Sequence, residues 1–100
     1  MATVSKKELV DRIGQKTGTR QGTVKAVVQC FLDEITVELA RNNRLEFRDF
    51  GVFEPRAHHA RTAQNPKTLE RVHVPAKRTV KFKMGRKMHK RLNKGTTTHE

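Results

Sequence analysis

The sequence predicts an α+β fold in which two helices precede an antiparallel sheet and a short basic helix follows it. Three observations favour this class. Apolar residues recur at helical spacing before residue 40, apolar and charged residues alternate after it, and a long stretch near residue 60 has almost no large aliphatic side chain. A chain of 100 residues forms one domain at most, and 34% hydrophobic residues allow only a thin core, so oligomerisation is an expected source of stability.

The first helix is predicted by signals at both of its ends. Ser5 followed by Glu8 is typical of a capping box, in which the serine accepts a backbone hydrogen bond and the glutamate reaches back. Gly18 is a stop signal. The helix should therefore run from about Ser5 to Thr17.

The second helix is predicted by a strong amphipathic stripe. Thr19 is its expected cap, and residues 41–44 are expected to end it. The stripe contains Val24, Val27, Val28, Phe31, Leu32, Ile35 and Leu39. It predicts a buried face against an antiparallel first helix, with Cys30 as a small core residue beside it.

Short strands are expected in the second half of the chain. Leu45 and Phe47 alternate with charged neighbours, and Asp49 begins a turn. Gly51 is expected to give the chain conformational freedom there. Further strands are expected at residues 52–53 and 79–83, and a very basic helix at residues 86–93.

The stretch from Pro55 to Val74 allows two interpretations. Its only large aliphatic residue before Arg71 is Leu69, so burial cannot order it. It is either a disordered loop or a hairpin arm that projects from the body. Asn65-Pro66 is a turn signal at its middle, and the roughly symmetric flanks favour the arm.

Charge predicts the class of partner. The chain has 22 Lys and Arg against 10 Asp and Glu, a net charge of +12, and the second half alone carries +10. A polyanion is expected, with nucleic acid ahead of an anionic membrane surface. A single cysteine, no apolar run long enough to span a membrane and no signal-peptide core predict an intracellular, cytoplasmic protein.

Chemistry other than binding is not expected. The five histidines lack the spacing of a zinc site, and the carboxylates lie mostly in the helical half, away from any arrangement suited to Mg²⁺. We therefore expect no enzyme activity, no metal, no cofactor and no small-molecule substrate. An RNA-binding protein is allowed by composition, although no signature of an RNA-binding domain is present.

The order of four motifs resembles the bacterial HU / integration host factor family over about residues 4–93. The motifs are Phe50-Gly51-Val52-Phe53, Asn65-Pro66, Pro75-Ala76-Lys77-Arg78 and Phe82-Lys83-Met84-Gly85-Arg86. The resemblance implies an intertwined homodimer, with a three-stranded antiparallel sheet and a long β-arm between a helical hairpin and a short C-terminal helix. The domain would span residues 1–94, with a dimerisation part at 4–43, a sheet at 44–83, an arm at 55–75, a helix at 84–94 and a flexible tail at 95–100.

The resemblance also implies a nucleoid-associated architectural protein that binds and bends double-stranded DNA with low sequence specificity. Its arms would enter the minor groove, and Pro66 would insert between base pairs. The implied DNA-binding residues are Lys6, Arg56, His58, Arg61, Gln64, Asn65, Pro66, Lys67, Arg71, Lys77, Arg78, Lys81, Lys83, Arg86 and Lys87. The implied dimer core contains Phe31, Phe50, Phe53 and Phe82.

The sequence departs from the family pattern at five positions. Ala63 and Gln64 stand where the tip usually has glycine and arginine, and His58 stands where another arginine is common. Leu69 replaces a glycine near the arm tip, and Met84 replaces a proline before the last helix. These changes put the exact turn type and the strength of binding in doubt. A site-preferring protein similar to integration host factor stays open as an alternative to low-specificity binding.

Overall fold

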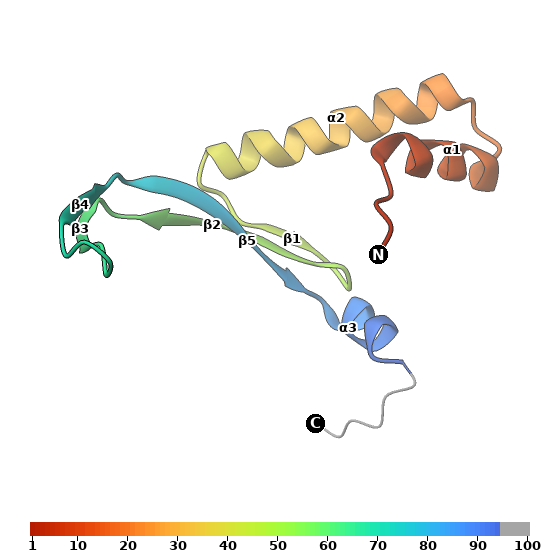
Figure 1. Ribbon diagram of the computed structural model, residues 1–100. Coiled ribbons are helices and arrows are strands. Elements are labelled where there is room, and N and C mark those ends of the chain that lie inside the picture. Colours follow the sequence, from red (N-terminus) through yellow and green to blue (C-terminus); the bar gives the residue numbers. More distant parts are fainter. Residues whose placement is uncertain (95–100) are drawn as a thin grey trace. The chain divides into compact units, whose positions relative to one another are not determined.

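A computed structural model describes residues 1–94 of the chain. It divides into two compact units, one comprising residues 1–37 and the other starting at Glu38. In chain order the elements are α1 (Lys6–Thr17), α2 (Gln21–Ala40), β1 (Leu45–Phe47), β2 (Gly51–His58), β3 (Arg61–Gln64), β4 (Arg71–Val74), β5 (Lys77–Met84) and α3 (Arg86–Leu92) (Figure 1). The predicted α+β class is confirmed.

The first unit contains α1 and most of α2. The hydroxyl of Ser5 accepts a hydrogen bond from the backbone N–H of Glu8 at 3.3 Å, and Gly18 ends α1 in the left-handed conformation, with φ 65°. Both end signals of the first helix are thus confirmed. Two side-chain hydrogen bonds, from Lys6 to Gln29 and from Gln21 to Asp11, join the helices in antiparallel order.

Thr19 does not cap α2, so that prediction is wrong by one position. The helix begins at Gln21, and the carbonyl of Arg20 accepts the backbone hydrogen bond of Val24 at 3.0 Å. The hydroxyl of Thr19 accepts a hydrogen bond from the hydroxyl of Thr17 at 2.8 Å instead. A threonine two residues after a helix end competes for local partners, because its hydroxyl reaches the preceding turn.

The second unit is built on two antiparallel ladders. The order β1-β2-β5 forms a three-stranded sheet, and β3 pairs with β4 in a separate two-stranded sheet. Eight residue pairs join β2 to β5, from Gly51–Met84 to His58–Lys77, and four join β3 to β4. Figure 1 shows the β3–β4 hairpin extending from the far end of β2 and β5. The hairpin-arm interpretation is therefore correct, and the arm contains a gap in pairing at residues 59–60 and 75–76.

One face of the three-stranded sheet is aromatic. The register places Phe53 opposite both Leu45 and Phe82. The ring centroids of Phe53 and Phe82 are 4.8 Å apart, and Phe50 lies 5.5 Å from Phe82. Tilted contacts at such distances favour a fixed arrangement of the rings.

Gly51 is needed for close approach rather than for conformational freedom. The left-handed residue of the turn is Asp49, with φ 68°, and Gly51 already belongs to β2. A Cβ at Gly51 would lie 2.6 Å from the ring of Phe82 and 2.7 Å from the carbonyl oxygen of Lys83. The absence of a side chain is what lets the Phe82 ring cross the strand.

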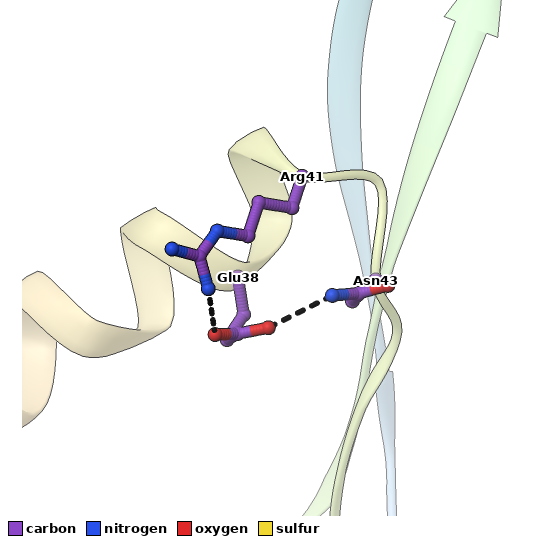
Figure 2. A network of polar contacts seen from close by, with 3 residues as sticks. All are labelled: Glu38, Arg41 and Asn43. Carbon is purple, nitrogen blue, oxygen red and sulfur yellow. Dashed lines mark hydrogen bonds and ion pairs between the residues drawn. The ribbon is translucent and has the colours of Figure 1, made fainter.

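The C-terminal end of α2 is held by a small polar network. The carboxylate of Glu38 accepts hydrogen bonds from Arg41 at 3.2 Å and from the side-chain amide of Asn43 at 2.8 Å (Figure 2). Between them, Asn42 adopts a left-handed conformation with φ 66°. Asparagine tolerates this region, so the chain leaves the helix and enters β1 without strain.

One chain buries very little apolar surface. Val10 and Val24 are the only buried hydrophobic residues among residues 1–94. The rings of Phe31, Phe50 and Phe82 are 53%, 48% and 39% exposed, Phe53 is half-buried, and Cys30 is exposed. Within a single chain these residues are therefore not fully buried, and their burial in a dimer core stays a prediction.

Candidate nucleic-acid interface

The register of β2 and β5 gathers charged and polar side chains on the face opposite the phenylalanines. Side chains alternate between faces along a strand, and directly opposite residues of antiparallel strands share a face. The sheet's charged face consists of Val52, Glu54, Arg56 and His58 from β2 and Lys77, Thr79, Lys81 and Lys83 from β5. Four of these eight residues are lysine or arginine, so the face has the sign expected for a polyanion.

One carboxylate, that of Glu54, moderates that charge. Arg56 lies 3.8 Å from Glu54, and Glu54 is directly opposite Lys81. The His58 ring and the Thr79 hydroxyl are 3.2 Å apart, which fixes the imidazole at the root of the arm. The exposed Arg56 and Glu54 side chains hold each other only weakly, so a phosphate can compete for the guanidinium.

Arg78 lies away from the charged face. It shares the face of Phe82, and its Nη2 donates to the carbonyl oxygens of Leu39 and Ala40, at 3.0 and 2.9 Å, and to Oδ1 of Asn42 at 2.6 Å. These carbonyls belong to the last turn of α2, where they lack helical partners. Arg78 therefore joins the helix end to the sheet and neutralises the negative end of the helix dipole.

Arg78→Met should lower stability without changing the salt dependence of DNA binding. Methionine keeps an unbranched apolar stem but has no N–H to donate, and charge-assisted hydrogen bonds of this kind contribute about 1.5–3 kcal/mol. Urea unfolding and a salt series of binding constants measure the two effects. The matched control is Lys77→Ala on the charged face, which should keep the unfolding midpoint and reduce the salt slope by about 0.9 per lost phosphate contact. A smaller salt slope with an unchanged unfolding midpoint in the Arg78 variant would indicate that Arg78 contacts DNA instead.

The arm tip is a short loop held by several local hydrogen bonds. The backbone N–H of Asn65 donates to Glu70 at 2.8 Å and its carbonyl accepts from Leu69 at 2.7 Å. The Asn65 side chain accepts from the N–H of Lys67 at 2.9 Å, an Asx turn that begins at the residue before the proline. Gln64 Nε2 donates to the carbonyl of Leu69 at 3.2 Å. Pro66 is exposed at the centre of this loop.

Leu69 occupies a backbone conformation that leucine disfavours. Its φ is 63°, and among the described residues the other non-glycine positions with positive φ are Asn42 and Asp49, types that tolerate it. The left-handed region costs a residue with a branched side chain roughly 1–2 kcal/mol. Leucine is therefore an unfavourable residue at this position of the turn. The hydrogen bonds of the Leu69 backbone with Asn65 and Gln64 hold it in the left-handed conformation.

The other cations predicted to bind DNA lie on separate elements. Arg61 and Arg71 lie on β3 and β4, with Gln64 paired to Arg71. Arg86 and Lys87 begin α3, and the Lys87 ammonium lies 3.9 Å from Asp49 in the turn before β2. Lys6 belongs to α1 in the first unit.

A family profile described as "Bacterial DNA-binding protein" matches residues 4–93. The chain belongs to the HU / integration host factor family. It is 41% identical over 100 residues to a probable DNA-binding protein HU of Chlamydia pneumoniae, covering 99% of each chain. It is also 41% identical to the integration host factor subunit alpha of Mannheimia succiniciproducens, over 92% of this chain and 94% of that one.

A solved HU structure shares the fold. The cocrystal structure of Anabaena HU with DNA matches with a TM-score of 0.79 and 30% identity, covering 91% of this chain and 99% of that one. Members of the HU / integration host factor family are non-enzymatic, architectural DNA-binding proteins, and this chain is an HU-like DNA-binding protein. Within residues 1–94, no helix is both long and apolar enough to cross a membrane.

Proposed function

We propose that two copies of this chain form a homodimer that binds and bends double-stranded DNA through its arms and so compacts the nucleoid. The carrying observation is the basic hairpin arm, which ends in a turn with Pro66 exposed and continues the sheet that bears the charged face. In this proposal the charged face contacts the phosphates. The two arms reach around the duplex and enter the minor groove.

The exposed apolar surface supports a dimer. Each unit of the chain leaves large side chains uncovered, among them Val27 and Phe31 in the first unit and Phe50 and Phe82 in the second. A chain of 100 residues with so small a core would be marginally stable alone. A second copy provides apolar faces of the same kind, because a two-fold interface pairs one surface with itself.

The chemistry of proline supports insertion at the tip. Pro66 is rigid and apolar and has no N–H to lose on entering a base step. Insertion of apolar side chains between base pairs is the mechanism of minor-groove architectural proteins, HU and integration host factor among them, at a cost of a few kcal/mol per unstacked step. Phosphate contacts made by Arg61, Lys67 and Arg71 would offset this cost through counterion release.

The proposal includes low sequence specificity, and the alternative is a preference for particular DNA sites. The tip has few groups able to read bases, and the minor groove distinguishes little beyond A·T from G·C. Identity does not separate the two kinds of relative, since the Chlamydia HU and the Mannheimia integration host factor subunit are both 41% identical to the chain. Site preference is therefore an outcome that the experiment must be able to detect.

The proposal is tested by titrating the purified protein against straight, kinked and random-sequence duplexes over a series of salt concentrations. End-to-end energy transfer reports bending. Binding should weaken by about a thousandfold or more between about 50 and 200 mM salt. Kinked duplexes should bind more tightly than straight ones, since part of the deformation is already made.

Three other outcomes have distinct meanings. Tight binding to one sequence alone would favour an integration-host-factor-like protein. Preferential binding of competing duplex RNA would favour an RNA-binding protein. A flat salt response together with unbent DNA would refute the proposed function.

A further inference from the structure

Leu69 combines two unfavourable features at the arm tip. Its side chain is 68% exposed, and its backbone is left-handed. An exposed leucine lacks the stabilisation of burial, and the left-handed region adds a steric cost, so both raise the free energy of the unbound protein. Strained residues of this kind persist where the surrounding structure holds them, and they are concentrated at ligand-binding sites.

Both backbone polar groups of Leu69 are hydrogen-bonded within the tip. Its N–H donates to Asn65 at 2.7 Å, and its carbonyl accepts from the side chain of Gln64 at 3.2 Å. The side-chain amide of Gln64, one of the DNA-binding residues that the family resemblance implies, is thereby hydrogen-bonded within the loop. The tip presents two exposed apolar residues, Pro66 and Leu69, in a loop held by these hydrogen bonds.

Charge alone does not explain binding at the tip. Between Gln64 and Arg71 the chain has two cations, Lys67 and Arg71, and one carboxylate, Glu70. The net charge of this loop is small in comparison with the rest of the second half of the chain. Apolar contact is a further means by which the tip can hold DNA, and leucine is among the side chains that minor-groove proteins insert between base pairs.

We propose that Leu69 is a second apolar group that enters the minor groove beside Pro66, and that it makes each arm select easily unstacked base steps. This inference rests on the proposed function. A wider apolar insertion deforms more of the duplex than proline alone. Its cost therefore varies more with the sequence being deformed, and pyrimidine–purine steps yield most readily.

The test compares Leu69→Asn, Leu69→Gly and Leu69→Met on duplexes with a central TA step and on duplexes with a stiff A-tract. Asparagine and glycine suit the left-handed backbone, so these variants keep the loop while removing the apolar side chain. Both should bind the TA duplex about tenfold more weakly, with an unchanged salt slope, and should lose the preference for TA over the A-tract. Leu69→Met should retain both properties.

The readouts are the dissociation constant, end-to-end energy transfer and the fluorescence of 2-aminopurine placed beside the TA step. Val72→Ala, which removes an exposed apolar side chain elsewhere on the arm, is the matched control and should behave as wild type. Wild-type affinity and preference in Leu69→Asn and Leu69→Gly would overturn the inference, while bending that depends on Pro66 would keep the proposed function. A wild-type protein that does not bend DNA would refute both.

Discussion

Phe82→Ala is expected to remove the folded dimer at micromolar concentration. The Phe82 ring contacts Phe50 and Phe53 and crosses Gly51 at the centre of the aromatic face. Removing a phenylalanine from a core costs about 3–5 kcal/mol, and each dimer loses two rings. Small domains have a total stability of about 5–15 kcal/mol, so this loss uses up most of it.

Thermal unfolding at several protein concentrations and sedimentation measure the effect. Wild-type protein should melt at a temperature that rises with concentration, because association stabilises the folded state. Val72→Ala provides the control, since Val72 lies on β4 rather than on the aromatic face. A wild-type monomer with a concentration-independent melt, or a Phe82→Ala protein that melts like wild type, would contradict the dimer.

Pro66→Ala should reduce DNA bending much more than DNA affinity. Each inserted side chain kinks a duplex by about 20–90°, at a cost of a few kcal/mol for unstacking. Alanine has too little bulk to keep the base step open, so the kink closes and the unstacking cost is recovered. That recovery offsets much of the lost contact, while the phosphate contacts and the salt slope persist.

Energy transfer across an end-labelled duplex and a parallel binding titration separate the two effects. The matched control is Pro75→Ala, which makes the same chemical change at the root of the arm and should leave the bend intact. An unchanged bend in Pro66→Ala would show that Pro66 does not insert. Equal losses in both proline variants would point to a general change in the arm instead.

Sequence reasoning succeeded where the signals are local. Ser5 and Gly18 mark the ends of α1 because capping depends on neighbouring residues, and Asn65-Pro66 marks the arm tip for the same reason. It left the turn type at Leu69 open, because leucine's own preference argues against a left-handed conformation. The hydrogen bonds that override that preference become visible only in the folded loop.

The position of Arg78 on the face of the phenylalanines follows from its spacing along β5. Arg78 and Phe82 are four residues apart on one strand, so strict alternation places them on the same face, whereas Lys77, Lys81 and Lys83 have the opposite parity. Its contact with the end of α2 could be seen only in the fold, since Leu39 and Arg78 are distant in sequence.

The phenylalanines show a different limit of prediction from one sequence. Their pattern predicts burial, but one chain cannot supply the surface that would cover them.

The break in pairing at residues 59–60 and 75–76 separates the outer hairpin, β3–β4, from the β2–β5 ladder. Pairing stops at His58–Lys77 and resumes at Arg61–Val74, so the outer hairpin can unzip at the cost of its own four pairs. The eight pairs of the base do not depend on it. We therefore expect the outer hairpin to open or tilt while the β2–β5 ladder keeps its pairing. In the proposed dimer, this would let the two arms fit duplexes of different curvature while the charged faces stay unchanged.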